Sequence, residues 1–461
     1  MSGEAPSRLV IGPFNRVEGD LEVRLDLAEG RVAAAYVTAP LYRGFERMLI
    51  GRPPSDALVI APRICGICSL AQGTAAARAL ASAAGLTPPV NGRRMADLLL
   101  ACENAADHLT HFYLFFMPDF ARAGYAGRGW YGEAARRFTA MTGEATRAAA
   151  AARVRLLHLM GILAGRWPHS LTVQPGGVAK AMDKGERLRA GAVLSEFRAF
   201  LEQRTFGDSL ERIAALDRLA ATPDGDFGMF LAIAGDLGLG DWGKGPARFV
   251  SFGTGTQADL PGLTEDLSHS WLQGDSLHPA AGITEPDADK AGAYSWCKAP
   301  RLAGESGETG ALARRLAAGQ PLLREMTAAA GGRGTVLSRV VARLIELAQL
   351  VLEMEGLLRD LGEAGPYCLT RDLPPRATGV GLVEAARGSL GHWLSIDQGR
   401  IARYQVVAPT TWNFSPRDAA GNPGPLEQAL VGVPVAAGDD EPLLVSHIVR
   451  SFDPCMNCTV H

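Results

Sequence analysis

The chain has 461 residues, of which 47% are hydrophobic and 21% are charged, as in an ordinary soluble globular protein. The formal net charge of −3 gives no electrostatic reason to expect nucleic acid as a partner. We find no apolar run of ~20 residues and no signal-peptide pattern, so we expect neither a transmembrane span nor export.

The first half of the chain begins with strands and continues with helices. In residues 1–52, Leu21, Val23, Leu25 and Leu27 alternate with polar neighbours, which favours a half-buried strand, and a second strand at 32–37 follows a turn. Residues 53–219 are rich in Ala and Leu, and Gly and Pro interrupt them. The pattern predicts helices at roughly 54–62, 70–85, 90–116, 128–141, 144–164 and 178–203.

The second half is more mixed. Residues 220–300 are rich in Gly, Asp and Pro and predict irregular loops, whereas 301–365 predict two long helices, at 307–331 and 334–363. Residues 366–461 predict short strands near 379–383, 394–396 and 401–407. We therefore expect one body spanning 1–461, mainly α with small β elements (α+β).

Two C-x-x-C pairs suggest a metal site. Cys65 and Cys68 lie near the N-terminus, and Cys455 and Cys458 lie at the C-terminus. Thiolates select zinc, copper(I), Fe–S clusters or nickel. Structural zinc sites gather their ligands within a few dozen residues, but the spacing alone leaves zinc and a redox-active metal equally open. If the pairs meet, the two ends of the chain pack together around a buried metal site beside a helical-bundle core.

The cysteine count bears on the compartment. Seven cysteines are an odd number, and four of them belong to the two pairs. This favours reduced thiols in a cytoplasmic protein over a disulfide framework.

Further motifs extend along most of the chain in a fixed order. They are Arg16-Val17-Glu18-Gly19, Arg43-Gly44-Phe45-Glu46, Arg63-Ile64-Cys65-Gly66-Ile67-Cys68, Asp107-His108, Tyr294-Ser295-Trp296-Cys297-Lys298-Ala299-Pro300-Arg301, Ala386-Arg387-Gly388, Pro409-Thr410-Thr411-Trp412-Asn413 and Asp453-Pro454-Cys455-Met456-Asn457-Cys458-Thr459-Val460-His461. In these motifs the sequence resembles the large subunit of [NiFe]-hydrogenases.

The resemblance implies a nickel–iron centre. Cys65, Cys68, Cys455 and Cys458 would bind nickel, and Cys68 and Cys458 would also bridge to iron. The iron would carry two cyanides and one carbon monoxide. Ala386, Pro409 and Thr410 would surround these small ligands.

The resemblance also implies catalytic roles. Heterolytic cleavage of H₂ needs a Lewis acid and a base. Arg387 would lie over the open metal position, Asp107 and Asp453 would hold its guanidinium, a terminal cysteine thiolate (Cys455) would receive the proton, and Glu18 would relay it outward. Read one at a time, these charged residues would more often be surface groups.

A magnesium ion is implied beneath the C-terminus. Its ligands would be Glu46, His461 and the backbone carbonyl of Val406. Magnesium prefers oxygen ligands and keeps several waters, which this ligand set allows.

Three positions favour a hydrogen-sensing (regulatory) subgroup over an energy-conserving uptake enzyme. Ile67 and Phe115 stand where Val and Leu are usual in the gas channel, and Gln72 stands where a histidine is usual. The sequence also ends at His461; in this family that means either that a C-terminal extension has been removed during maturation or that none is encoded, and the second option is typical of the regulatory subgroup. Either Ile67 or Phe115 alone would be a routine core choice.

Partners follow from what this chain lacks. Only three other cysteines remain, and they are scattered, so we expect no Fe–S cluster in this chain and a partner subunit that carries such clusters. A sensor would also engage a histidine kinase through that subunit. A purely structural zinc protein and a subunit of a proton-pumping complex are the other classes, and the second is disfavoured because such relatives lack these cysteines.

Overall fold

The computed structural model describes residues 7–219, 224–253, 260–362 and 365–461. An antiparallel sheet opens the chain, formed by β1 (Ser7–Ile11), β2 (Glu22–Ala28) and β3 (Arg31–Thr38). Val23 pairs with Val37, and Leu25 pairs with Ala35. All four side chains are buried, so one face of this sheet belongs to the core.

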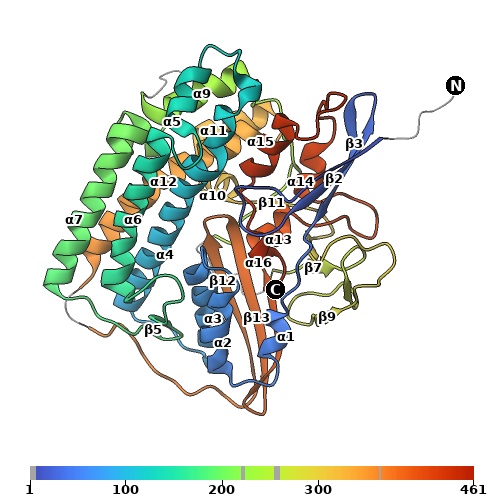
Figure 1. Cartoon of the computed structure of the whole chain (residues 1–461). Coiled ribbons are helices and arrows are strands. Elements are labelled where there is room, and N and C mark those ends of the chain that lie inside the picture. The colour runs from blue at the N-terminus through green and yellow to red at the C-terminus, as the bar shows by residue number, and fades with distance from the viewer. Residues whose placement is uncertain (1–6, 220–223, 254–259, 363–364) are drawn as a thin grey trace.

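A layer of long helices forms the largest part of the molecule (Figure 1). Its helices are α4 (Val90–Thr110), α6 (Glu144–Ala164), α7 (Lys184–Phe200) and α12 (Val336–Asp360). α4 packs against both α6 and α12, and α12 is buried along most of its length. Shorter helices complete the layer: η3 (His111–Phe116), η4 (Met117–Ala121), η5 (Ala123–Tyr125), α5 (Tyr131–Phe138), η6 (Leu201–Phe206), α8 (Leu210–Ala214) and α9 (Gly225–Asp236).

A second antiparallel sheet is formed by the C-terminal part of the chain. It contains β12 (Ala377–Ala385), β13 (Gly388–Asp397) and β14 (Arg400–Val407). β12 lies directly against α3 (Ser69–Ala84). A Cβ atom on Gly381 would come within 1.9 Å of the Ala75 carbonyl oxygen. Glycine therefore allows this close approach of strand to helix.

Small elements connect these parts. Before α3 come α1 (Phe45–Leu49), η1 (Pro54–Asp56), α2 (Ala57–Ile60) and η2 (Ala61–Arg63). The middle contains β4 (Val173–Gln174), β5 (Gly177–Val178), β6 (Phe249–Val250), β7 (Leu263–Asp266), β8 (Leu272–Gln273), β9 (Glu285–Pro286), β10 (Ala299–Leu302), β11 (Glu308–Thr309), α10 (Ala311–Ala317) and α11 (Pro321–Ala329). The C-terminal part adds α13 (Pro409–Asn413), α14 (Pro425–Leu430), α15 (Leu443–Ser451) and α16 (Met456–Thr459). The C-terminal His461 is buried and lies against α1 and β14, through Glu46 and Val406 (Figure 1).

The predicted fold class, mainly α with small sheets, is confirmed. Three local predictions were wrong. The helix at 307–331 is two helices, because Gly319 takes a positive φ of 85° and Pro321 starts α11. The helix at 178–203 begins only at Lys184, after an Asp183 capping box. Residues 225–236, expected to be irregular, form α9. No helix in the described ranges is long and apolar enough to cross a membrane.

Candidate metal centre

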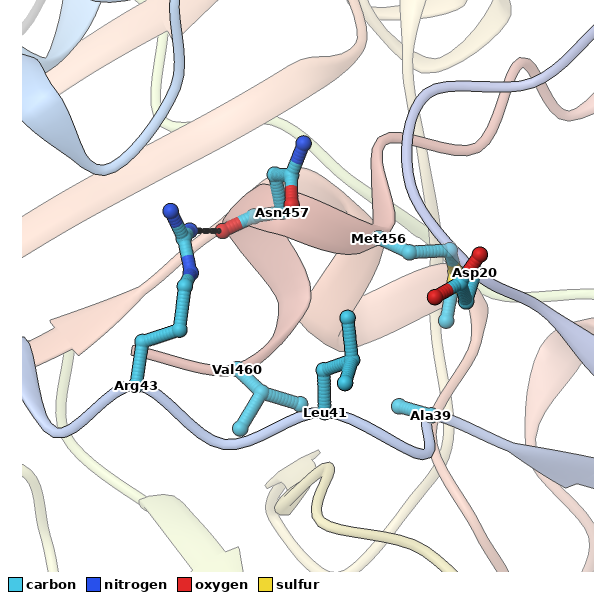
Figure 2. A pocket seen from close by; sticks show the side chains of 7 residues that line it. All are labelled: Asp20, Ala39, Leu41, Arg43, Met456, Asn457 and Val460. Atoms are coloured by element: carbon cyan, nitrogen blue, oxygen red, sulfur yellow. Dashed lines mark hydrogen bonds between the residues drawn. The ribbon is translucent and has the colours of Figure 1, made fainter.

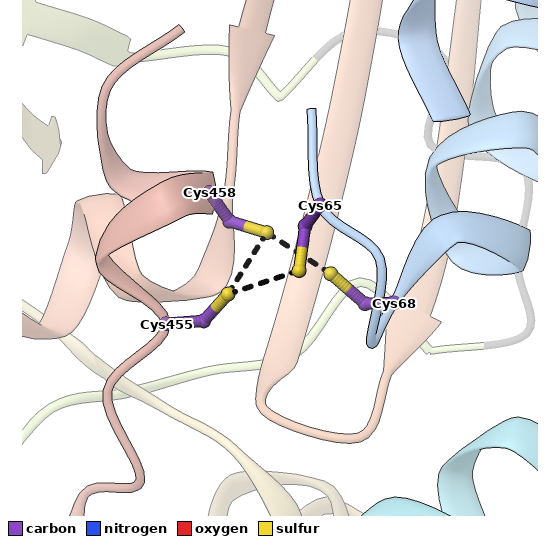
Figure 3. Close-up of side chains that lie close together, drawn as sticks. All are labelled: Cys65, Cys68, Cys455 and Cys458. Atoms are coloured by element: carbon purple, nitrogen blue, oxygen red, sulfur yellow. Dashed lines mark hydrogen bonds between the residues drawn. The ribbon is translucent and has the colours of Figure 1, made fainter. Parts of the chain in front are cut away.

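The four cysteines of the two C-x-x-C pairs meet in the interior. Their Sγ atoms all lie within 4.8 Å of one another (Figure 3). The Sγ–Sγ distances are 3.4 Å for Cys65–Cys455, 2.9 Å for Cys68–Cys458 and 3.2 Å for Cys455–Cys458. All four side chains are buried. Four sulfurs gathered in a buried space are a donor set for a thiophilic metal such as nickel or zinc.

The first pair lies in the turn between η2 and α3. Cys68 is the N-cap residue of α3, and the N–H of Ile67 donates to Cys65 Sγ at 3.3 Å. Arg43 donates to the Ile64 carbonyl at 2.5 Å and also to the Asn457 carbonyl. One guanidinium therefore ties the first cysteine turn to the C-terminal one.

The second pair is held by the N-terminal segment and by α13. Glu18 forms a parallel β-bridge with Cys455, and its carbonyl accepts the N–H of Met456 at 2.7 Å. The N–H of Cys455 donates to the Thr410 hydroxyl at 3.1 Å. The Glu18 carboxylate accepts the side-chain amide of Asn457 at 2.8 Å. Glu18 thus contacts the second cysteine turn with both its backbone and its side chain.

Arg387 and two aspartates form a buried cluster that also contacts this turn. The Arg387 guanidinium donates to both carboxylate oxygens of Asp107, to Asp453 Oδ1 at 3.2 Å and to the Asp453 carbonyl at 3.0 Å. Asp453 lies two residues before Cys455 and has a positive φ of 58°. The structure therefore brings together the three charged residues that the sequence grouped.

Burial and the neighbouring charges shift the pKa values of this cluster in opposite directions. Burial raises the pKa of Asp107 to about 7, although Arg387 opposes the shift. Burial alone would lower the pKa of Arg387, but Asp107 and Asp453 raise it well above its ordinary value. Burial would raise the pKa of Asp453, but Arg387 lowers it below its ordinary value. The guanidinium is therefore a fixed positive charge.

A second polar site lies beneath the C-terminus. His461 Nε2 is 2.5 Å from the Val406 carbonyl oxygen and 3.7 Å from Glu46 Oε1. Lys298 donates to Glu46 at 3.0 Å and to Gln405 at 2.6 Å. The three predicted magnesium ligands therefore lie close together at one buried position: Glu46, Val406 and His461. The Lys298 ammonium group also contacts Glu46 there.

The remaining predicted positions surround the cysteines. Ile67 lies within the first cysteine turn, Phe115 lies in η3 and its carbonyl accepts Arg16 at 2.9 Å. Gln72 is buried on α3 and its Oε1 lies 2.7 Å from His392 Nε2. Ala386 and Pro409 are both buried next to residues of the site, Arg387 and Thr410. Their roles toward gas or iron ligands stay predictions.

Comparison with known proteins decides between the metals that this donor set allows. A family model described as nickel-dependent hydrogenase matches residues 43–126 and 148–461. The chain belongs to the nickel-dependent hydrogenase family. It is a hydrogenase large subunit, and its cysteine cluster is the counterpart of a nickel–iron centre.

Similar proteins cover nearly the whole chain. The periplasmic [NiFeSe] hydrogenase large subunit of Desulfomicrobium baculatum is 29% identical, over 98% of this chain and 95% of its own. The hydrogenase-2 large chain of Escherichia coli K12 is 27% identical, over 98% and 97%. The crystal structure of a reduced, active Ni-Fe-Se hydrogenase from D. baculatum has a TM-score of 0.85, with 27% identity over 99% of this chain and 100% of that one.

Sequence reasoning did not predict a buried ionic network next to Asp107 on α4, formed by His108, Glu346 and Arg314. His108 Nε2 lies 2.8 Å from Glu346 Oε2, and Arg314 also pairs with Glu346 at 2.5 Å. Burial would raise the pKa of Glu346, but Arg314 holds it well below its ordinary value. The only sign of it in the sequence was Glu346, a charged residue within the apolar pattern of α12. Its partners, His108 and Arg314, come from distant segments, so the sequence could not pair them.

Proposed function

We propose that this large subunit oxidises H₂ at a nickel–iron centre held by Cys65, Cys68, Cys455 and Cys458, with iron bound through Cys68 and Cys458 and carrying carbon monoxide and two cyanides. The observation that carries the proposal is the convergence of four buried sulfurs within 4.8 Å beside the Arg387 cluster. When bound, the metals would supply the Lewis acid and accept the electrons.

The residues of this chain would supply the acid–base chemistry. The H–H bond would break unevenly, and the Cys455 thiolate would take one proton. The two electrons would leave through the bound metals, and the other hydrogen would then leave as a second proton. Arg387 stays protonated and presents its positive charge to the reacting position, held by Asp107 and Asp453. Glu18, which is bridged to Cys455 through the backbone, takes the proton next and passes it outward.

Glu18→Gln tests this assignment. Glutamine keeps the size of the side chain and an acceptor for Asn457 but cannot carry the proton. We expect H₂ oxidation to fall by about 10²-fold or more, while infrared bands of carbon monoxide and cyanide stay as in the wild type. Unchanged turnover would exclude Glu18 as the relay.

Magnesium is proposed at the second polar site. Glu46, the Val406 carbonyl and His461 already converge there, and waters would complete the octahedral shell that Mg²⁺ prefers. The ion would fix the last residue of the chain directly beyond the second cysteine pair.

A small subunit carrying Fe–S clusters is proposed as the partner, because electrons must leave through a relay. Arg43 and Asn457 flank a small pocket over α16, together with Asp20, Ala39, Leu41, Met456 and Val460 (Figure 2). Leu41 is 51% exposed there. Docking on this face would bring the partner's clusters close to α16, the segment that carries Cys458.

Within this activity we propose the hydrogen-sensing role. It is supported by bulkier side chains at both predicted channel positions, Ile67 and Phe115, and by Gln72 in place of a histidine. Narrowing an apolar channel slows O₂ more than the smaller H₂. Cytoplasmic placement, low turnover and engagement of a histidine kinase through the small subunit belong to this proposal.

An uptake role is the second candidate. The names of several relatives favour it, including the uptake hydrogenase large subunit of Bradyrhizobium diazoefficiens, 26% identical over 98% of this chain. The double variant Ile67→Val/Phe115→Leu separates the two roles. A sensor should lose activity in air faster when its channel is widened, and oxygen sensitivity that does not change would favour the uptake role.

A further inference from the structure

A buried carboxylate outside the metal site caps α3, the helix that follows Cys68. Glu103, on α4, is 2% exposed. Its carboxylate accepts the backbone N–H of Leu70 at 2.9 Å, the backbone N–H of Ala71 at 2.8 Å and the indole N–H of Trp167 at 2.8 Å. All three donors are neutral N–H groups, and no ion pair to this carboxylate is found among the residues that the structure describes.

The need for such a group follows from the position of Cys68. The first N–H groups of any helix lack carbonyl partners and are usually capped by the N-cap side chain. Here the N-cap residue is Cys68, which makes no side-chain cap, because its sulfur points to Cys458 at 2.9 Å. A sulfur committed to the metal site cannot also cap the helix. Glu103 supplies the missing acceptor from a neighbouring helix.

The loop that orients Glu103 also holds the other side of the cysteine turn. Trp167, which binds the Glu103 carboxylate, lies two residues before His169. The N–H of His169 donates to the Ser69 hydroxyl at 3.2 Å, and its Nδ1 donates to the Pro62 carbonyl at 3.0 Å. The turn that contains both Cys65 and Cys68 is thus fixed on its two flanks by one loop.

We propose that Glu103 is a positioning residue for Cys68, acting through the first turn of α3 on the sulfur that faces Cys458. The proposal rests on the function proposed above, because it requires Cys68 to be a metal ligand. Residues that orient metal ligands from behind commonly change metal affinity by about 10–100-fold when they are removed.

Glu103→Gln in the complete, metal-loaded complex tests the proposal. The glutamine side chain replaces one acceptor oxygen with an N–H₂ group, which faces the N–H of either Leu70 or Ala71. We expect nickel release to a chelator to accelerate about tenfold or more, and the nickel–sulfur shell in X-ray absorption to broaden. Trp167→Phe, which removes only the indole donor, should change both readouts in the same direction by a smaller amount and serves if Glu103→Gln fails to fold.

Glu427→Gln is the matched control. Glu427 is 0% exposed and its carboxylate likewise accepts two backbone N–H groups, from Val37 and Gly424, and a side-chain donor, the Tyr294 hydroxyl. It caps α14, and its three donors belong to neither cysteine turn. This variant should keep the wild-type nickel spectrum and release rate.

The outcomes separate this proposal from the one on which it rests. If wild-type protein binds nickel through sulfur and Glu103→Gln matches Glu427→Gln in both readouts, the positioning role is wrong. If the wild type shows no sulfur-bound nickel, the proposed function itself fails.

Discussion

Arg387→Lys tests whether the shape of the guanidinium, and not only its charge, serves the reaction. Arginine offers a rigid planar fork, whereas lysine is a flexible point charge. In the structure the fork makes hydrogen bonds to both oxygens of the Asp107 carboxylate, to one carboxylate oxygen of Asp453 and to the Asp453 carbonyl. A single ammonium cannot reach all of these acceptors.

The expected magnitude follows from those contacts. A hydrogen bond to a charged group contributes about 1.5–3 kcal/mol, so loss of two of them costs about 3 kcal/mol or more. The substituted side chain would also move the positive charge by ~1 Å or more, which is enough for a ~10²-fold loss of rate. We therefore expect H₂ oxidation per nickel to fall about 100-fold, with the nickel content unchanged.

The assay is H₂-dependent reduction of an artificial electron acceptor, normalised to bound nickel. Arg301→Lys is the control, because Arg301 is also buried and binds Asp418 at 3.1 Å and the Pro416 carbonyl at 3.2 Å, outside the metal centre. It should lose stability and keep its rate per nickel. Wild-type turnover in Arg387→Lys would refute the reasoning, because charge alone would then suffice.

Three other changes have expected outcomes. Burial raises the pKa of Glu427 from 4.5 to about 7. Between pH 4.5 and about 7 the Glu427 carboxyl is therefore protonated in the folded protein and ionised in the unfolded chain. Its contribution to stability therefore falls by about 3 kcal/mol as pH rises through this window, and urea unfolding of Glu427→Gln should show a flatter pH dependence; the same slope as wild type would contradict this. His461→Ala should abolish bound magnesium in elemental analysis and unfold at the temperature of chelator-treated wild type, whereas retained magnesium would exclude His461 as a ligand. Thr410→Val leaves the buried N–H of Cys455 without its acceptor and should lower the free energy of unfolding by about 1–3 kcal/mol. Thr410→Ser keeps the hydroxyl and should unfold with the wild-type free energy. Equal unfolding free energies of all three proteins would argue against this hydrogen bond.

The sequence predicted the centre better than its surroundings. The cysteine pairs at the two ends of the chain could be grouped because two thiolate pairs can serve one metal ion. Arg387, Asp107 and Asp453 were grouped only through the resemblance to [NiFe]-hydrogenases. Glu103 could not be recognised, since the N–H groups on α3 and in the Trp167 loop that donate to its carboxylate come together only through packing. A buried glutamate in an Ala-rich helix carries no periodic signal of its own.

Secondary structure was also predicted better in some segments than in others. Long amphipathic segments such as α6 were predicted to within a residue, because apolar spacing sets them locally. The strands of the second sheet are longer than the sequence predicted, because Gly379 and Gly381 weaken the strand pattern of β12. The small size of these two glycines is what lets β12 lie on α3. Tertiary contact thus decides elements whose residues have poor intrinsic preference for strand.

Nickel K-edge X-ray absorption of the purified complex tests the central claim most directly. Because the four cysteine sulfurs lie within 4.8 Å of one another, nickel should show a first shell of sulfur from all four, and Cys455→Ser should reduce it. Nickel absent from the wild type and replaced by zinc, or a shell without sulfur, would contradict the account.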